Sequence, residues 1–536
     1  MSATKRFLLI LPSTVLACAL LGGFAAPYLG VASAASDNAE VSDSLKQFSK
    51  VLSMVEQKYA DKVDTEQAIY EGAIPNMLRV LDPHSQFFDP ESFKQLRDDQ
   101  RGRYAGVGMQ IGARPMGNSV VTVVIAPFPK TPAYKAGLRP GDVIANVNGE
   151  SMDGLNTNEV AKRLRGPAGT SVKIGVERRG VDKLLEFEVT RAEIPRKSVP
   201  VAFHLKPDVG FIRVDSFNET TGRELDESLR ELDADKLQGL ILDLRDNPGG
   251  LLSEGVFVSD KFLDKGLPIV SHHGRNSAER VYKSQRPDGG HGFPIVVMVN
   301  CRSASASEIV AGALQDHDRA LIAGTNTFGK GLVQTVHQLG DNNEAGIALT
   351  TARYYTPSGR LIQRRYDTVS LYEYYSDPCS EHYRPKNDEV KMTDGGRKVF
   401  GGGGITPDVK LEEPKVNDFQ IELRRKFAFE NYAQEFTQKH PDLEKNWEPD
   451  ELTIEDFRQY LHREKVEFKE AQFSENIDFI KRFLKREIYV SAYDLDEAER
   501  VRFELDPEVQ QALELLPKAQ ALLDSAKAKQ RKIAMR

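Results

Sequence analysis

The spacing of apolar side chains changes several times along the chain, and each change predicts a different kind of structure. Between residues 37 and 101 apolar positions recur every three or four residues, which predicts helices interrupted by a turn at LDPHS (81–85). From about 104 to 189 short apolar runs alternate with glycine turns, which predicts a β-rich unit with one short helix at 156–166.

Between residues 210 and 408 apolar runs alternate with helical stretches, a pattern typical of an α/β core. The strand candidates are GFIRVDSF, GLILDLRD, PIVVMVN, RALIAG, LVQTVHQL and GIALTTARYY. No glycine follows Gly404, although the chain contains 41, and the spacing beyond it is helical throughout. The predicted organisation is therefore multidomain α/β, with these parts: 1–35, a signal or anchor; 36–102, helical; 103–192, β-rich; 193–415, the α/β core, to which 36–102 contributes; and 416–536, helical.

The first 35 residues have the features of an export signal. Lys5 and Arg6 precede a long stretch without charge, and Ala32-Ser33-Ala34 forms an A-x-A cleavage pattern. The apolar run is long for a signal, so an uncleaved membrane anchor is an alternative, and a buried helix is another. We expect an exported protein of the periplasm or cell envelope, soluble after cleavage or anchored to the inner membrane.

Composition narrows the functional classes. The chain of 536 residues is 40% apolar and 28% charged, as expected for a soluble globular protein of several domains. Its formal net charge of −7 argues against nucleic acid as a partner. The three cysteines, Cys18, Cys301 and Cys379, lack the spacing of a zinc site and are too few for a disulfide framework.

The β-rich unit opens with Gly106-Val107-Gly108-Met109 and continues with AGLRPGDVI (136–144). Its order of strand, helix and strand, together with these motifs, resembles a PDZ domain of the kind found in bacterial proteases. The resemblance implies that backbone amides of residues 106–109 hold the terminal carboxylate of a peptide, which adds to the sheet as a strand. A generic β-sandwich fragment is the structural alternative.

The segment NCRSASASEIVAGAL (300–314) places Ser303, Ser305 and Ser307 between a predicted strand and a predicted helix. A turn of this kind aims the unpaired N–H groups of the helix at a bound group, and these favour an oxyanion. A serine nucleophile also needs a base. Serines often cap helices, so a purely structural role stays open at this point.

No histidine is clearly placed to be that base. His272, His273 and His317 are nearest the predicted core strands, and we expect them at the surface. Lys330 lies between two glycines and leads into an apolar strand, where burial can lower a lysine pKa to roughly 7–8. Gln334 could hold the lysine amine by a hydrogen bond. The alternative is a turn lysine that points into water.

A phosphate-binding loop is a further alternative for the same segment. GTNTFGK (324–330) fits the first seven positions of a P-loop, but Gly331 stands where a Ser or Thr should bind magnesium. A P-loop also opens a helix, whereas LVQTVHQL is a predicted strand. Nucleotide binding is therefore disfavoured.

Several motifs together resemble the carboxyl-terminal processing proteases, the tail-specific serine peptidases of family S41. The motifs are NCRSASASEIVAGALQDHDRALIAGTNTFGKGLVQT (300–335), DLRDNPGG (243–250), TPSGRLIQ (356–363), GGGGITPD (401–408) and LDPHS. The resemblance covers roughly residues 40–415 and implies a crotonase/Clp-like α/β core. It implies these site residues: Ser305 as nucleophile, Lys330 as base, Gln334 as its partner, and an oxyanion hole formed by the N–H of Ala306 and of Gly249 or Gly250.

The resemblance implies a serine endopeptidase that cleaves proteins near their C-termini, with the PDZ unit capturing the tail. Arg165 is a candidate for transmitting the signal of tail binding from the PDZ unit to the active site. The alternative is an ordinary surface arginine. No metal or organic cofactor is implied. Expected partners are proteins or peptides with free C-termini and further copies of the chain; an adaptor or activator and membrane association through the N-terminus are left open. A catalytically silent PDZ scaffold of the cell envelope is the alternative function, and a hydrolase of small esters is another.

Two parts of the chain depart from the family pattern. A Tyr-rich polar stretch at 364–399 separates TPSGRLIQ from GGGGITPD, and its role as lid, docking loop or inert excursion is open. Region 416–536 lies outside the resemblance. We expect its aromatic positions to form core or subunit contacts: Phe419, Phe427, Phe429, Tyr432 and Phe436.

Overall fold

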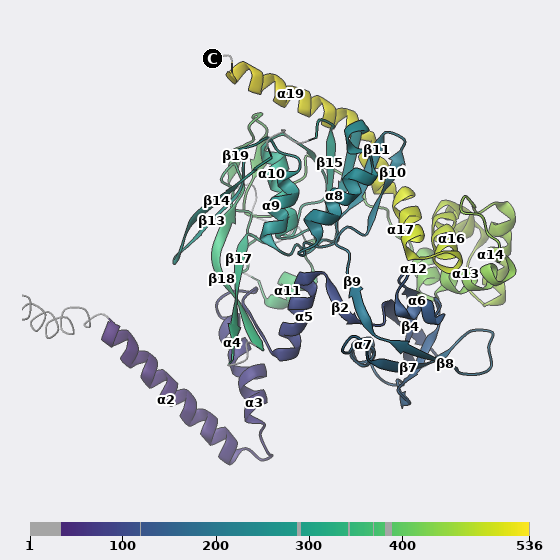
Figure 1. Cartoon of the computed structure of the whole chain (residues 1–536), viewed down its shortest axis with the longest axis horizontal. Helices are drawn as coiled ribbons and strands as arrows, with labels where there is room; N and C mark the ends of the chain where they lie inside the picture. The colour runs from purple at the N-terminus through teal and green to yellow at the C-terminus, as the bar shows by residue number, and fades with distance from the viewer. Residues whose placement is uncertain are drawn as a thin grey trace, which may run out of the picture. The chain divides into compact units, whose positions relative to one another are not determined.

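The computed structural model describes residues 34–117, 119–286, 291–340, 344–367, 369–380 and 389–534 (Figure 1). The predicted signal or anchor therefore lies outside the described residues except for its last two positions. None of the described helices is long and apolar enough to cross a membrane. The chain divides between Leu81 and Asp82 into two compact units.

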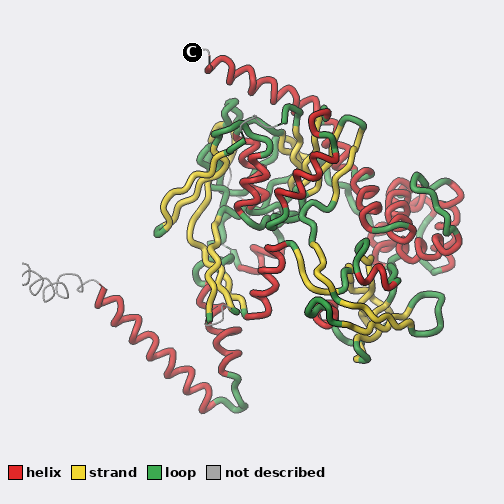
Figure 2. The backbone as a smooth tube through the Cα atoms, in the orientation of Figure 1, coloured by secondary structure: helices red, strands yellow, loops and turns green. Residues whose placement is uncertain are grey.

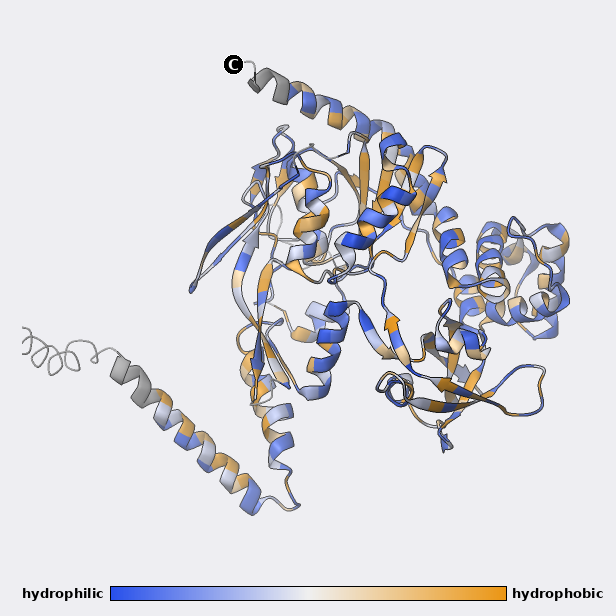
Figure 3. Ribbon diagram, viewed as in Figure 1, coloured by the Kyte–Doolittle hydropathy of each residue, from blue (hydrophilic) through white to orange (hydrophobic). Residues whose placement is uncertain are grey.

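The first unit is helical, as the apolar spacing predicts. Its elements are α2 (Ala34–Lys58), α3 (Thr65–Gln67), the π-helical turn η1 (Ala68–Ala73) and α4 (Ile74–Arg79). Orange and blue positions alternate along α2 in Figure 3, and several of its large apolar side chains are exposed: Val41, Leu45, Phe48, Val51, Met54, Val55 and Tyr59.

The second unit is built around a six-stranded sheet in the order β10-β11-β12-β15-β16-β21. Its strands are β10 (Val201–Lys206), β11 (Val209–Arg213), β12 (Gly239–Asp243), β15 (Ile295–Val299), β16 (Leu321–Gly324) and β21 (Val409–Lys410). All neighbours are parallel except β10 and β11. Parallel strands that are covered on both faces are continuous apolar runs in the sequence. For this reason the sequence predicts four of these strands directly: β11, β12, β15 and β16.

Helices cover both faces of this sheet, and alternate strand residues point to each. Leu240 and Leu242 pack in one cluster with helices α8 (Thr221–Glu231), α9 (Leu252–Asp260) and α10 (Ala306–Asp316). Ile241, between them, packs in a second cluster with the C-terminal helices that follow residue 494. Period-two alternation between two apolar layers is the expected result of a pleated strand.

A second, five-stranded sheet lies beside the core. Its members are β1 (Gln86–Phe88), β13 (Pro268–Gly274), β14 (Ser277–Lys283), β17 (Leu332–Leu339) and β18 (Ala345–Tyr355). β18 pairs with β1, β13 and β17, all antiparallel. LVQTVHQL therefore forms a strand as predicted, and Lys330 does not open a helix, which removes the structural basis for a P-loop.

The PDZ-like unit forms a six-stranded sheet with the path β3-β4-β5-β7-β8. Its elements are β3 (Met109–Met116), β4 (Ser119–Pro127), α6 (Pro132–Ala136), β5 (Val143–Val147), β6 (Glu150–Ser151), α7 (Thr157–Leu164), β7 (Ser171–Glu177) and β8 (Leu185–Thr190). The ribbon of β2 (Arg103–Gly106) and β9 (Ala192–Pro195) connects the unit to the rest of the chain, after α5 (Pro90–Arg101). Asn148 and Gly149, between the paired strands β5 and β6, both have positive φ, as a two-residue hairpin turn requires.

The described part of the C-terminal region consists of helices joined by loops, as predicted (Figure 2). Its helices are α12 (Asp418–Arg425), α13 (Ala428–Lys439), α14 (Glu451–Arg463), α15 (Glu470–Glu475), α16 (Ile477–Ala492), α17 (Leu495–Glu504), α18 (Pro507–Glu514) and α19 (Leu516–Ala534). Four of the five singled-out aromatics lie in one buried cluster within the chain: Phe419, Phe429, Tyr432 and Phe436. Phe427 differs, because its ring lies under the guanidinium of Arg114 of the PDZ-like unit, 4.9 Å from the centroid.

Candidate active site

Ser305 occupies the tight turn between β15 and α10. It has φ of 54° and ψ of −112°, a left-handed conformation that is rare for a residue with a side chain and often marks a functional turn. Ala306 begins the helix, and its N–H therefore has no acceptor in the preceding turn. The predicted strand, serine turn and helix are thus confirmed. We call residues 300–307 the serine turn.

The two outer serines have structural roles. Ser303 donates from Oγ to the carbonyl oxygen of Leu244 at 2.7 Å, and Ser307 donates to that of Asn247 at 3.0 Å. Both side chains are fully buried. They fasten the serine turn to the DLRDNPGG segment, which leaves Ser305 as the only member of the cluster with a partly exposed side chain.

The glycine pair of DLRDNPGG lies directly beneath the serine turn. A Cβ on Gly249 would meet the carbonyl oxygen of Ala304 at 2.6 Å and the nitrogen of Ala306 at 2.8 Å, so this approach requires glycine. The N–H of Gly249 already donates to Asn247 Oδ1 at 2.8 Å. Within the described residues the N–H of Gly250 has no acceptor. Of the two glycines, Gly250 is therefore the one whose N–H is available to a bound group.

Lys330 lies on a loop, residues 325–331, that we call the lysine loop. Burial lowers the pKa of its amine, while the negative charges of Glu308 and Asp82 act in the opposite direction. Across the described parts of the chain, Nζ makes no hydrogen bond or ion pair with another residue. A lowered pKa makes the neutral amine, the form that a general base requires, more accessible than it is in an exposed lysine.

A buried glutamate joins the two loops. Glu308 Oε2 accepts from the backbone N–H of Ser305 at 2.8 Å and of Lys330 at 2.9 Å. Its Oε1 accepts from Gly329 N–H at 2.7 Å and from Thr327 Oγ1 at 2.6 Å. Burial raises the pKa of this carboxyl, although the four donors oppose the shift. Glu308 was not predicted as a site residue, yet it follows Ser305 at the spacing of a capping box, and that spacing is the signal that could have identified it.

Tyr354 of β18 makes a second connection. Its hydroxyl lies within hydrogen-bond distance of the carbonyl oxygens of Ser305, at 3.2 Å, and of Lys330. The ring is buried, and burial raises the pKa of the phenol well above its ordinary value. A backbone hydrogen bond from Phe328 N–H to Ser303 O, at 2.9 Å, adds a third link between the loops.

Gln334 lies on β17, near the lysine loop. Its Nε2 donates to Thr350 Oγ1 at 3.2 Å. The described structure has no hydrogen bond between this amide and the amine of Lys330. The role predicted for Gln334 therefore stays a prediction.

His84, in the LDPHS motif, lies close enough to Lys330 for the charge of that lysine to affect the pKa of its ring. It is nevertheless a poor candidate for the catalytic base. Tyr375 donates its hydroxyl proton to Pro83 O at 2.6 Å, so it accepts from His84 Nδ1 at 3.2 Å. The other ring nitrogen faces Tyr374 Oη at 3.1 Å. Burial, and next the charge of Lys330, lower the pKa of His84 to about 3. His84 is therefore neutral and fully engaged.

The prediction that His317 lies at the surface is wrong. Its side chain is buried, and both ring nitrogens have hydrogen-bond partners there. Nδ1 lies 2.7 Å from Asp394 Oδ2, and Nε2 lies 2.7 Å from Pro268 O. His273 is exposed and His272 is partly buried. Within the described residues none of the three forms a hydrogen bond with Ser305.

The PDZ-like loop has the features of a carboxylate site. In the described structure the N–H groups of Val107 and Gly108 have no acceptor, while the side chains of Val107 and Met109 are buried in the domain core. Gly108 has φ of 80°, and a Cβ there would meet Thr131 at 2.5 Å. Arg165 lies beside Gly106, with its guanidinium 5.3 Å from the centroid of the Tyr104 ring.

β3, which follows this loop, is an edge strand of the described sheet. An unpaired strand edge next to free backbone amides is the geometry needed for a peptide to add as a further strand.

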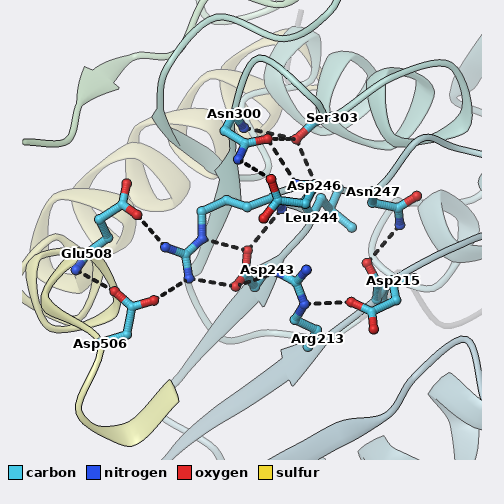
Figure 4. A network of polar contacts seen from close by, with 12 residues as sticks. Arg213, Asp215, Asp243, Leu244, Asp246, Asn247, Asn300, Ser303, Asp506 and Glu508 are labelled. Atoms are coloured by element: carbon cyan, nitrogen blue, oxygen red, sulfur yellow. Dashed lines mark hydrogen bonds and ion pairs between the residues drawn. The ribbon is translucent and has the colours of Figure 1, made fainter. Parts of the chain in front are cut away.

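The DLRDNPGG segment is also held from the side opposite the serine turn. The Arg245 guanidinium lies 2.8 Å from Asp243 and from Asp506 and 2.6 Å from Glu508, and Figure 4 shows these carboxylates with Arg213 and Asp215 in one network. Asp243 is fully buried, and its two arginines lower its pKa although burial opposes them. Asp506 caps α18 and Glu508 lies in its first turn, so the network ties the C-terminal helices to the DLRDNPGG segment.

The structure describes no cluster of three or more His, Cys, Asp or Glu side chains that could hold a metal ion.

Comparison with known proteins identifies three regions of the chain. Residues 208–368 match peptidase family S41, residues 123–178 match a PDZ domain, and residues 26–92 match the N-terminal domain of the activating protease CtpB. These matches and the described structure together confirm the predicted fold class: a helical N-terminal region, a PDZ domain, an S41 protease core and a helical C-terminal region. The chain is a peptidase by class.

Relatives narrow the class to a family. A carboxy-terminal-processing protease of Bartonella bacilliformis is 42% identical over 324 residues, 60% of this chain and 72% of that protein. Carboxy-terminal processing protease CtpB of Bacillus subtilis is 35% identical over 341 residues, 62% of this chain and 69% of that protein. A solved photosystem II D1 C-terminal processing protease is 33% identical, with 67% of this chain and 86% of that chain covered and a TM-score of 0.34. The chain belongs to the carboxy-terminal processing proteases.

Proposed function

We propose that the chain is a serine endopeptidase with a Ser305–Lys330 dyad, which cleaves protein substrates near their C-termini. The observation that carries this proposal is the serine turn: Ser305 is held with positive φ between two backbone N–H groups that have no acceptor among the described residues, those of Ala306 and Gly250. A base with a lowered pKa is attached to the same turn through Glu308.

In the proposed mechanism neutral Lys330 accepts the proton of Ser305 as Oγ attacks the scissile carbonyl. The N–H groups of Ala306 and Gly250 stabilise the oxyanion. Lys330 then returns the proton to the leaving amine, and it activates the water that releases the acyl group. Gln334 would orient the lysine amine once substrate is bound. No step needs a metal or an organic cofactor.

We further propose that the PDZ domain selects substrates by their free C-terminus. The amides of Val107 and Gly108 would bind the carboxylate, Gly106 and Met109 would bound the loop, and the peptide would extend β3. Arg165, beside Gly106, would sense the occupied loop. An adaptor or activator is a compatible further partner, because the N-terminal region matches a domain of an activating protease.

The cellular setting and assembly are proposals as well. Export to the periplasm or cell envelope rests on the basic start and A-x-A pattern of residues 1–35, which lie almost wholly outside the described structure. Self-association rests on α2, whose exposed apolar side chains recur at helical spacing and would be covered by the same helix of a second copy. Sedimentation equilibrium of the chain with and without Leu45→Glu would decide this point.

The function is tested with the full chain and an unstructured protein substrate. Ser305→Ala and Lys330→Ala should each abolish cleavage while circular dichroism stays unchanged, and Ser303→Ala should keep cleavage if the variant folds. Cleavage that survives Ser305→Ala contradicts the dyad. A folded wild-type chain that binds tails but cuts nothing, with or without cell extract, would favour the silent PDZ scaffold. Cleavage of small esters alone would favour a general hydrolase.

A further inference from the structure

A segment that follows TPSGRLIQ lies against both loops of the proposed dyad. It begins with α11 (Leu371–Ser376) and ends at Cys379; we call residues 371–379 the strap. From the sequence alone, its role stays open among a lid, a docking loop and an inert excursion. The contacts of the strap distinguish these roles, because one joins it to the serine turn and others join it to the lysine loop.

The first attachment is covalent. Cys379 forms a disulfide with Cys301, which belongs to the serine turn and precedes Ser305 by four positions. This bond could not be expected from the sequence, because its two cysteines are 78 residues apart. A cross-link at this place limits the freedom of the serine turn relative to the strap.

The second attachment joins the strap to the lysine loop. Buried Arg364 donates to the carbonyl oxygens of Tyr374 at 2.5 Å and Pro378 at 3.3 Å. Its guanidinium lies 4.2 Å from the ring centroids of both Phe328 and Tyr374. The backbone N–H of Arg364 donates to Gly329 O at 2.8 Å. One arginine therefore holds the strap against the two residues that precede Lys330.

The third attachment consists of Tyr374 and Tyr375, which contact His84 and Pro83 as described above. Gln363 Nε2 also donates to Tyr374 Oη at 3.2 Å. Gln363 also accepts from Gly331 N–H at 2.9 Å, so this contact too ends on the lysine loop. The strap thus contacts the serine turn at one end and the lysine loop along its length.

We propose that the strap is a redox-dependent positioning element, in which the Cys301–Cys379 disulfide keeps the serine turn aligned with the lysine loop. This proposal rests on the proposed dyad. It assigns a positioning role to Tyr374, Arg364 and the two cysteines, none of which needs to touch substrate. Catalysis is sensitive to displacements of about 1 Å between reacting groups, so a loosened strap lowers turnover.

The disulfide is open to exchange with a dithiol. Cys379 is exposed, whereas Cys301 is buried, and the bond borders an open hollow of about 740 Å³ lined by residues such as Thr325, Lys410 and Leu411. A thiolate of the dithiol attacks Cys379 Sγ, and Cys301 leaves as a thiolate that takes up a proton. The second thiol of the reductant then closes its own disulfide and releases Cys379. The enzyme gains two electrons and two protons, which the dithiol loses.

The test uses the full chain in a Cys18→Ser background, so that only Cys301 and Cys379 can report. Cleavage is measured for the oxidised form, after dithiothreitol treatment, and after reoxidation, with alkylation and mass spectrometry to verify each state. We expect reduction to lower kcat about tenfold or more with KM little changed, and reoxidation to restore it. Cys379→Ser should match the reduced form and ignore dithiothreitol.

Hydrogen exchange separates this proposal from the proposed function. Amides of the lysine loop should exchange faster after reduction, while those of β7 in the PDZ domain should not change. Equal kcat in verified oxidised and reduced forms overturns the proposal. If no form cleaves and Ser305→Ala behaves identically, the proposed function has failed; faster exchange at 325–331 on reduction would then still support the strap, and unchanged exchange would overturn it.

Discussion

At the scale of single residues, the electrostatics of Lys330 set the expected pH dependence. In the proposed dyad this amine must be neutral to accept the serine proton, so we expect activity to fall as pH drops below its pKa. Burial lowers that pKa below the ordinary 10.5, and Glu308 and then Asp82 oppose the shift. We therefore expect kcat to rise with pH and to level off at a pH below 10.5, measured with one substrate at constant ionic strength.

Asp82→Asn tests which charges tune this lysine. Asp82 accepts from the N–H groups of His84 and Ser85 at 2.7 and 2.8 Å, and an asparagine oxygen can keep both contacts. Removing its negative charge should shift the midpoint of the kcat–pH curve to lower pH. Asp235→Asn, at an exposed position of the short helix Ala234–Lys236, is the matched control. A shift to higher pH, or the same shift in both variants, would refute this account of the lysine.

At the scale of the elements, the oxyanion assignment makes Gly250 sensitive to the smallest side chain. Its φ is 148°, and a Cβ there would lie 2.0 Å from the carbonyl oxygen of Phe217, so the backbone must move. Because the displaced N–H no longer points at the oxyanion, we expect Gly250→Ala to lower kcat by about 10²–10³-fold. Gly292→Ala, with nothing within 4 Å of its Cβ, should leave kcat unchanged. Near wild-type turnover of a folded Gly250→Ala chain would exclude this donor.

The strands and the serine turn were predictable because their signals are local. Buried parallel strands such as β12 and β15 are uninterrupted apolar runs, and a serine between a strand and a helix needs no distant partner to be recognised. Glu308 carried a local signal too, since it stands three residues after Ser305.

Contacts between segments far apart in the sequence were not predictable. The bond between Cys301 and Cys379, the packing of Tyr374 on His84 and the burial of His317 each depend on how elements meet in space. Periodicity reports that a face is buried, but it does not identify what covers the face. The choice between Gly249 and Gly250 likewise required the hydrogen bond of Gly249 to Asn247.

At the scale of the whole second unit, the C-terminal helices contact both the PDZ domain and the protease core. Ala126 of β4 packs in a buried cluster with Tyr489, Val490, Ala498 and Val501 of α16 and α17. Phe503, near the end of α17, stacks on Phe211 of the core sheet with centroids 5.2 Å apart. One helix therefore contacts both domains, and the next begins at the carboxylates that bind Arg245.

The Arg245 network should accordingly be a major contributor to stability. Its side chain is 7% exposed, and Arg245→Met would leave the fully buried Asp243 with Arg213 as its remaining ion-pair partner, at 3.1 Å. Removing one partner of a buried ion pair costs about 3–5 kcal/mol, so we expect a loss of this size in the free energy of unfolding. The measurement is denaturant unfolding followed by circular dichroism.

A matched arginine and a double-mutant cycle make this prediction specific. Arg302 also pairs with an aspartate, Asp246 at 2.7 Å, but its side chain is 62% exposed, so Arg302→Met should cost about 0–1 kcal/mol. Asp506→Asn removes the charge but keeps an oxygen acceptor that can cap α18. Its cost in the free energy of unfolding should be smaller in the Arg245→Met background than in the wild type. Additive effects, or equal costs for the two arginine variants, would mean that the C-terminal helices are held to the DLRDNPGG segment by apolar packing, with the ion pairs serving only to satisfy charges that the fold has buried.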